Sequence, residues 1–249
     1  MLRKHIKVES DRYYYHCDRL GMLVWQDMVQ GGGSYDSLFI GNIPSMFRFM
    51  WDHFSDVKPW HERELGSEDP SYKKDWSECC KGTIEYLRNH PCIMAWTLFN
   101  EGWGQFDARQ AEADVRELDP NRLIDSVSGW YDMHSGDFQS VHNYFRKLKV
   151  YKDYRRARDL DRSFVISEFG GYTYRVQGHS AYDSEYGYAQ YDNIGKWRNA
   201  VEDVFDHMSV LYGKGLGGYV YTQLSDVQEE TNGILTYDRR VNKMADISK

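Results

Sequence analysis

The stretch that decides the fold is His90-Pro-Cys-Ile-Met-Ala-Trp-Thr-Leu-Phe-Asn100-Glu101, an apolar run that ends in a carboxylate. A second run, Phe164-Val-Ile-Ser-Glu168-Phe-Gly-Gly171, has the same form. Continuous apolar runs of this length are typical of strands covered on both faces, as in a parallel sheet. The pattern predicts two buried strands that each deliver a glutamate where the strand ends. Parallel barrels place their active sites at those ends.

Two carboxylates on either side of a sugar's anomeric centre are the minimal apparatus for cleaving a glycosidic bond. Either glutamate alone could equally be a solvated acid at the start of a loop. The pair favours a site, because a carboxylate beside an apolar strand is costly unless it is paired or hydrogen-bonded. Asn100, directly before Glu101, could hold a sugar hydroxyl or fix the rotamer of the acid.

Strands alternate with helical stretches along the chain, which predicts βα units and a parallel sheet. The predicted strands are Leu2–Ile6, Met22–Gln26, Ile93–Phe99, Leu123–Val127, Ser140–Asn143, Phe164–Ser167 and Tyr219–Gln223. The predicted helices are Tyr72–Arg88, Ala108–Leu118 and Tyr188–Tyr212. No linker separates these segments. The glycine-rich stretch Gln30–Ser34 lacks the spacing of a nucleotide-binding loop.

Several motifs together resemble glycoside hydrolase family 2, the group that holds the bacterial β-galactosidases and β-glucuronidases. The two segments that look like its catalytic signatures are Trp96–Glu101 and Ser167–Gly171. Met1–His5 looks like its second barrel strand and Gly21–Asp27 like the third. Tyr221–Asp226 looks like the eighth strand, and Asn232–Asp238 looks like the loop that follows it. The resemblance implies a retaining β-glycosidase on an α/β fold, the (β/α)8 TIM barrel. It also implies that Glu101 is the general acid/base and Glu168 the nucleophile.

The resemblance extends along residues 1–249, which we expect to form a single, partial catalytic barrel domain. Because Met1 falls inside the look-alike of the second strand, the first strand and the family's upstream β-sandwich domains are expected to be absent. The chain would then be a catalytic fragment or a truncated gene product. An open barrel exposes strand edges, so self-association into a homo-oligomer and weak activity are expected of the chain alone.

Further site residues are implied at strand ends and in the loops that follow. Arg3 and Tyr144 match family positions that approach the nucleophile, although Arg3 could instead form an ordinary ion pair at the barrel end. His142 and His5 are either sugar contacts or structural histidines. The remaining candidates for contacts with the sugar are Asn100, Asp27, Gln223, Trp103, Trp130, Tyr131 and Tyr172. The aromatic members suit stacking on sugar rings, because they combine an apolar face with a polar group.

Composition excludes other classes. The chain has 31 basic and 38 acidic residues, a net charge of −7, which argues against a nucleic-acid partner. The sequence contains neither a membrane-length apolar run nor a signal-peptide pattern. The four cysteines lack metal-site spacing, which favours reduced thiols and a cytosolic setting by default. The absence of a targeting signal says little about location if the chain is truncated.

Neither a cofactor nor a metal is expected. A metal-dependent hydrolase would have to use the cluster His53, His61, Glu62 and Glu64, which reads better as a charged helix face or loop. A carbohydrate-binding fragment without turnover stays open as an alternative. The family's β-glucuronidases carry an Asn-x-Lys signature that meets the substrate carboxylate. Here the stretch Glu229–Gly233 has two acids and no lysine, so we expect a neutral β-glycoside, with galactoside first.

Overall fold

The computed structural model describes residues 1–48, 51, 54–151 and 162–245. The chain divides into two compact units. Unit 1 comprises Met1–Val141 and Lys152–Val165, and unit 2 comprises His142–Tyr151 and Ile166–Lys249. The chain passes between the units after Val141, Tyr151 and Val165, and each unit is described by itself.

Unit 1 is built on a four-stranded sheet of β1 (Leu2–Lys4), β2 (Val24–Asp27), β3 (Ile93–Asn100) and β4 (Leu123–Ser128). The strands follow one another in chain order and every neighbouring pair is parallel. The central strand β3 is the apolar run of the sequence, and its residues Ala95, Trp96, Leu98 and Phe99 are fully buried. Burial on both faces explains why this strand reads as a continuous apolar run.

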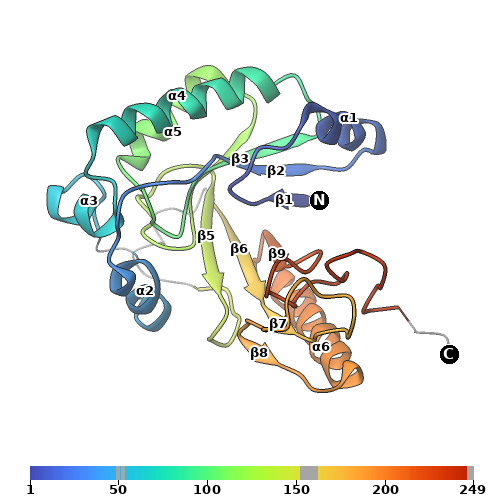
Figure 1. The fold of residues 1–249 in the computed structure, drawn as a ribbon. Coiled ribbons are helices and arrows are strands. Elements are labelled where there is room, and N and C mark those ends of the chain that lie inside the picture. The colour runs from blue at the N-terminus through green and yellow to red at the C-terminus, as the bar shows by residue number, and fades with distance from the viewer. Residues whose placement is uncertain (49–50, 52–53, 152–161, 246–249) are drawn as a thin grey trace. The chain divides into compact units, whose positions relative to one another are not determined.

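Helices connect the strands of unit 1, as parallel pairing requires. They are α1 (Asp11–Leu20), the π-helical turn η1 (Leu38–Asn42), α2 (Ile43–Met46), α3 (Pro59–Leu65), α4 (Pro70–Leu87) and α5 (Ala108–Leu118). Figure 1 shows α4 and α5 side by side, and α5 also packs on β3 and β4. The Asp69 side chain caps the start of α4 by accepting a hydrogen bond of 2.8 Å from the Ser71 N–H.

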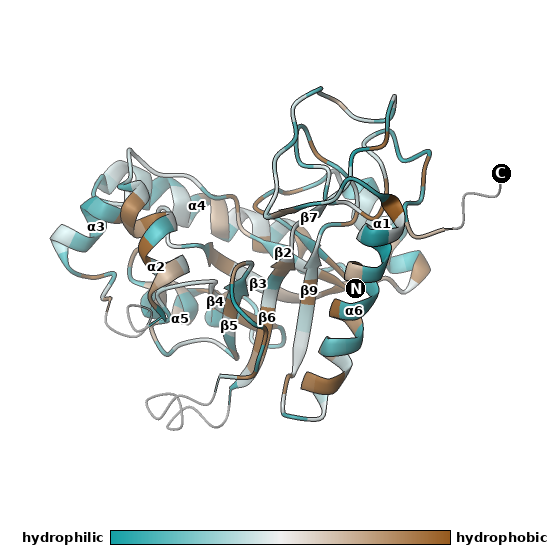
Figure 2. Cartoon of the chain, turned by 90° about the horizontal axis from the view of Figure 1, so that it is seen from below, coloured by the Kyte–Doolittle hydropathy of each residue, from teal (hydrophilic) through white to brown (hydrophobic). Residues whose placement is uncertain are grey.

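Unit 2 contains the C-terminal ends of β5 (Phe138–Asn143) and β6 (Ser163–Gly170), followed by β9 (Gly218–Thr222), in the sheet order β5-β6-β9. A separate parallel pair joins β7 (Tyr172–Thr173) to β8 (Ala189–Gln190). The helix α6 (Ile194–Tyr212) buries Trp197, Val201, Val204, Met208 and Leu211. This spacing of three and four residues is one face of a helix. Figure 2 shows the resulting mixture of hydrophobic and hydrophilic residues along α6.

All seven predicted strands are present, with ends that differ by up to three residues. Two expectations need correction. Glu168 does not end its strand, because β6 continues to Gly170. The helix predicted from Tyr188 begins at Ile194, because the preceding residues pair with the chain after β6: the Tyr188 N–H donates to the Gly171 carbonyl at 3.0 Å, and the Tyr191 N–H donates to the Thr173 carbonyl at 3.0 Å.

Two further observations bear on the class of protein. Among the helices in the described ranges, none combines the length and the apolar character needed to cross a membrane. Cys17, Cys79, Cys80 and Cys92 are all free thiols.

A buried acid in β4 gives a testable link between the sheet and pH. Asp125 is fully buried, and burial raises its pKa to about 7 against the opposing charge of Arg3. Because the pKa of Asp125 is raised in the folded state, its contribution to the free energy of unfolding is fully present below the unfolded pKa near 3.8. This contribution is lost as the pH rises through about 7. The difference corresponds to roughly 4 kcal/mol.

We therefore expect Asp125→Asn to be more stable than the parent at pH 8 by up to about 4 kcal/mol, and the advantage to shrink toward pH 4. Urea unfolding at several pH values measures the difference. Asp75→Asn, on the exposed face of α4, is the matched control and should track the parent. A variant that is less stable than the parent at pH 8 would show that ionised Asp125 stabilises the sheet.

Candidate active site

Glu101 follows β3 directly, at a turn that places its side chain beside the strand end. Its backbone has φ 53°, and its N–H donates to the Ser128 carbonyl of β4 at 2.9 Å. Gly102 continues the turn with φ 79°, and a Cβ at this position would lie 2.8 Å from the Tyr131 ring. Only glycine combines this conformation with so close an approach.

Glu101 is partly buried, and its carboxyl lies near Arg3 and His5. Burial raises its pKa above the usual value, and the nearby charges of His5 and Arg3 oppose that rise. A carboxyl kept protonated by burial is suited to donate a proton near neutral pH. Trp96, in β3, is fully buried and its indole N–H donates to Asp119 at 3.0 Å. Trp103, a candidate for contact with the sugar, has its ring centre 5.7 Å from that of Tyr35.

Arg3 and Asp27 form a buried ion pair at the ends of β1 and β2. The Arg3 Nε and Nη2 donate to the two oxygens of Asp27 at 3.0 and 2.9 Å, and the two side chains are 3% and 0% exposed. The Arg3 Nη2 also donates to the Asn100 Oδ1 at 2.9 Å. This bidentate arrangement fixes the guanidinium plane, and with it the amide of Asn100. Arg3 thus forms an ion pair at this end of the sheet, with Asp27 as the partner, and its approach to the nucleophile stays a prediction.

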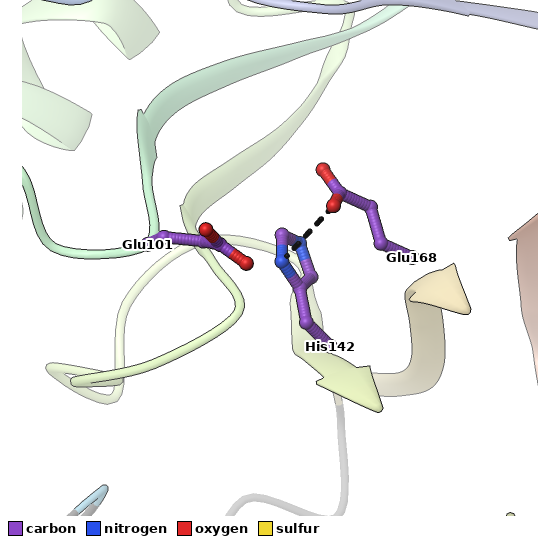
Figure 3. Close-up of side chains that lie close together, drawn as sticks. All are labelled: Glu101, His142 and Glu168. Atoms are coloured by element: carbon purple, nitrogen blue, oxygen red, sulfur yellow. Dashed lines mark ion pairs between the residues drawn. The ribbon is translucent and has the colours of Figure 1, made fainter. Parts of the chain in front are cut away.

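Glu168 has its own set of neighbours in unit 2. The Tyr144 hydroxyl donates to Glu168 Oε2 at 2.7 Å. His142 Nδ1 lies 3.4 Å from the same oxygen (Figure 3). The Tyr144 hydroxyl is also 3.0 Å from the Thr222 hydroxyl, and its ring stacks on Tyr188 at 4.2 Å. His142 is 1% exposed. Tyr144, named from the resemblance, therefore holds one carboxylate oxygen of Glu168 by a short hydrogen bond.

Gln223, directly after β9, belongs to a polar group whose other members we did not single out individually from the sequence. Its Nε2 donates to Glu230 Oε2 at 3.0 Å and to Asn232 Oδ1 at 2.5 Å. Glu230 lies in the stretch considered for its charge, and Asn232 also begins the segment that resembles the family's loop after the eighth strand. Their pairing with Gln223 depends on a loop that returns on itself: the Ile234 N–H donates to the Gln223 carbonyl at 3.0 Å.

The other aromatic candidates are engaged in packing. Trp130 is 6% exposed with its ring 5.8 Å from that of Trp51, and Tyr131 is fully buried with its hydroxyl donating to the Phe39 carbonyl. Tyr172 is partly buried, and its carbonyl accepts from the Trp197 indole at 2.8 Å.

The cluster considered for a metal makes other contacts. His53 lies outside the described residues. His61 Nδ1 is 2.7 Å from the Ser55 carbonyl, and Glu62 pairs with Lys73 at 2.6 Å. The contacts of His61 and Glu62 tie together neighbouring segments of unit 1.

The chain is α/β with parallel strands, and it places Glu101 directly after β3 and Glu168 near the carboxyl end of β6, as in a glycosidase barrel. The family model "Glycosyl hydrolases family 2, TIM barrel domain" matches residues 8–249. The chain belongs to this family. None of the curated proteins compared with it matches.

Solved structures share the fold at low sequence identity. A β-D-glucuronidase from Dictyoglomus thermophilum is 15% identical with a TM-score of 0.63, covering 97% of this chain and 42% of that one. A Bifidobacterium dentium β-glucuronidase in complex with coumarin-3-O-glucuronide is 15% identical with a TM-score of 0.61, covering 98% and 39%. A galacturonate-bound family 2 β-galacturonidase from Eisenbergiella tayi is 15% identical with a TM-score of 0.58, covering 97% and 42%. The chain thus spans less than half the length of these relatives.

Proposed function

We propose that the chain carries the catalytic residues of a retaining β-glycosidase, with Glu168 as nucleophile and Glu101 as general acid/base. The observation that carries the proposal is the different environment of the two glutamates. Burial favours the protonated form of Glu101, and Tyr144 donates a short hydrogen bond to Glu168. Two carboxyls with distinct environments are what a double displacement needs. Because one family model covers both units, we also propose that residues 1–249 act as one catalytic domain.

In this mechanism a Glu168 oxygen attacks the anomeric carbon while Glu101 transfers its proton to the departing glycosidic oxygen. The product is a glycosyl ester on Glu168 and a free aglycone alcohol. Glu101, now a carboxylate, removes a proton from water, and the resulting nucleophile displaces Glu168 from the anomeric carbon. Two inversions give overall retention.

The hydrogen bonds of Arg3 with Asp27 and Asn100 support a role in substrate binding. Because Asn100 Oδ1 accepts from Arg3, the amide N–H groups are the part of Asn100 that can donate to a sugar hydroxyl. Hydrogen bonds to the 2-hydroxyl strengthen in glycosidase transition states. We propose that Asn100 makes such a contact and that Asp27 acts indirectly, by holding Arg3.

The polar group around Gln223 supports a neutral sugar. The Gln223 amide nitrogen donates to Glu230 and to Asn232, so the group presents acceptor oxygens, the Gln223 Oε1 and the Glu230 carboxylate among them. Acceptors suit sugar hydroxyls and disfavour a substrate carboxylate. We therefore propose a neutral β-glycoside, with galactoside first, in contrast to the solved relatives, which are uronidases.

A panel of aryl β-glycosides tests both parts of the proposal. We expect turnover of the galactoside above the glucoside and the glucuronide, and NMR of the reaction should show the β anomer of the sugar forming first. An α anomer formed first would exclude retention, and a preference for the glucuronide would exclude the neutral sugar. Hydrolysis of none of them, with retained sugar binding, would favour a non-catalytic carbohydrate-binding role.

A further inference from the structure

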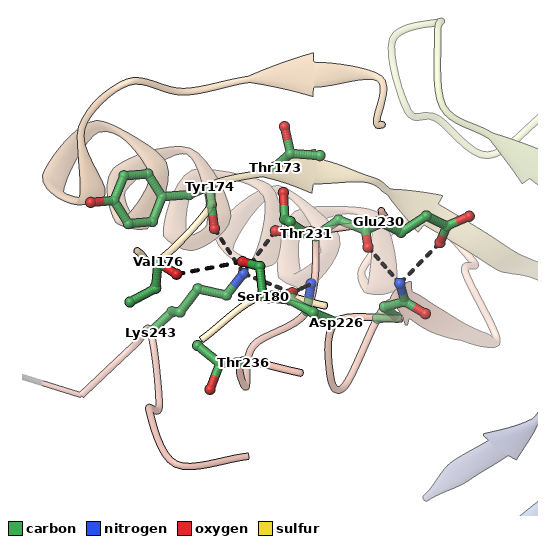
Figure 4. Close-up of polar contacts among 12 residues, drawn as sticks. Thr173, Tyr174, Val176, Ser180, Asp226, Glu230, Thr231, Thr236 and Lys243 are labelled. Atoms are coloured by element: carbon green, nitrogen blue, oxygen red, sulfur yellow. Dashed lines mark hydrogen bonds and ion pairs between the residues drawn. The ribbon is translucent and has the colours of Figure 1, made fainter. Parts of the chain in front are cut away.

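Lys243 is a fully buried lysine that contacts three segments of unit 2. Its Nζ donates to Asp226 Oδ1 at 2.9 Å, to the Thr231 carbonyl at 2.7 Å and to the Tyr174 carbonyl at 3.1 Å, as Figure 4 shows. An ammonium has three protons, and three acceptors surround this one. The Nζ also lies 5.2 Å from the centre of the Trp197 ring on α6.

A charge in this position is expensive unless the fold makes use of it. Burial lowers the pKa of Lys243, and the hydrogen bond to Asp226 opposes that shift. The three acceptors satisfy the ammonium, which is how a buried charge is retained. A methionine would fill similar space without the desolvation cost, but it could not donate hydrogen bonds. The ammonium of Lys243 therefore suits a site in which the positions of its acceptors must be fixed.

The contacts of Lys243 converge on the loop after β9, defined as residues 223–235. Asp226 Oδ1 accepts from the Gly233 N–H at 2.8 Å as well as from Lys243. The Thr231 carbonyl accepts from the Tyr174 N–H at 3.1 Å as well as from Lys243. The Lys243 N–H donates to the Ile234 carbonyl at 2.8 Å. The side chain and the backbone N–H of Lys243 thus contact both the first half of the loop, at Asp226, and its second half, at Thr231 and Ile234.

The residues held in this way flank the polar group around Gln223. Thr231 lies between Glu230 and Asn232, the two acceptors of the Gln223 amide. Gln223 follows Thr222, whose hydroxyl is 3.0 Å from that of Tyr144, the partner of Glu168. A displacement of Thr231 would therefore shift Glu230 and Asn232 directly, and the nucleophile only through further contacts.

We propose that Lys243 is a positioning residue for substrate recognition: its ammonium fixes the loop after β9 from behind, so that Gln223, Glu230 and Asn232 present a fixed set of acceptors to the sugar. The proposal rests on the glycosidase function proposed above. It assigns Lys243 no contact with substrate.

The test compares Lys243→Met with the double variant Lys243→Met/Asp226→Asn. The single variant leaves Asp226 buried and uncompensated, so it is expected to be destabilised. The double variant removes both charges, and the new asparagine keeps an oxygen for the Gly233 N–H. Lys196→Met, which removes an exposed ion pair with Asp192, is the control.

We expect the folded double variant to show a KM for the aryl galactoside raised about 10- to 100-fold with kcat within a few-fold, because misplaced contacts weaken binding before they reach the reacting groups. Amide hydrogen exchange over residues 226–235 should become faster in the double variant, while Lys196→Met leaves both measurements unchanged. Folding with unchanged KM and unchanged exchange would overturn the proposal, and so would a loss confined to kcat.

Hydrogen exchange separates this proposal from the proposed function. If the parent chain hydrolyses no glycoside, the glycosidase assignment fails, whereas faster exchange in the double variant would still identify Lys243 as the residue that orders the loop. If the parent is active and the loop exchanges equally in both, the assignment stands and the role of Lys243 is refuted.

Discussion

Glu168→Ala is expected to lower kcat for every aryl β-galactoside by roughly 10^5-fold or more, since removing the nucleophile of a covalent catalyst removes the pathway itself. Substrates with good and poor leaving groups should suffer alike, because neither can form the glycosyl ester. Initial-rate kinetics with a series of aryl leaving groups measures the effect. Tyr144→Phe, which removes the 2.7 Å hydrogen bond to Glu168, should produce a smaller loss.

Azide should restore turnover to Glu168→Ala, because a small anion can enter the space left by the carboxylate and attack the anomeric carbon. Glu101 still supplies the proton, so the product is an α-glycosyl azide, of inverted configuration. Glu202→Ala, on the exposed part of α6, is the matched control and should keep the parent's kcat. Failure of rescue in a folded variant, or a β-glycosyl azide as product, would remove Glu168 from the nucleophile role.

The central strand β3 could be predicted from the sequence because a parallel strand inside the fold is covered on both faces. β3 reads as an unbroken apolar run that ends in Asn100, and α5 coincides with its predicted bounds because its amphipathic period is regular. The short pair β7 and β8 escaped prediction. Two residues carry no periodicity, and their pairing depends on contacts between segments 17 residues apart, such as Tyr172 with Ala189.

Most members of the candidate site, but not Glu230 or Asn232, could be named individually from the sequence, whereas their contacts could not. Arg3 and Asn100 are 97 positions apart, and a motif at either end says nothing of the hydrogen bond between them. Lys243 and Tyr174 are 69 positions apart, and a lysine near the end of a chain gives no sign of full burial. Trp130 shows the complementary limit: residue type suits stacking on sugar, but packing against Trp51 decides where the ring lies.

Glu101→Ala should separate substrates by their leaving groups, in contrast to Glu168→Ala. A phenyl galactoside needs its oxygen protonated, so its kcat/KM should fall by about 10^2- to 10^4-fold. A dinitrophenyl galactoside departs without a proton, so its first step should be nearly unaffected and the glycosyl-enzyme should accumulate. Azide should then react with that intermediate and give a β-glycosyl azide, of retained configuration.

The dependence of kcat/KM on pH should also distinguish the role of Glu101 from that of Glu168. Burial raises the pKa of Glu101, and the active form is the protonated one, so the parent's kcat/KM for the phenyl galactoside should fall as pH rises through that value. Glu101→Ala should lose this alkaline limb, whereas Glu117→Ala, on the exposed part of α5, should keep it. If the two catalytic variants respond identically to leaving group, azide and pH, the division of labour between the glutamates is wrong. If only Glu101→Ala loses the alkaline limb, the burial of its carboxyl is what sets the working pH of the site.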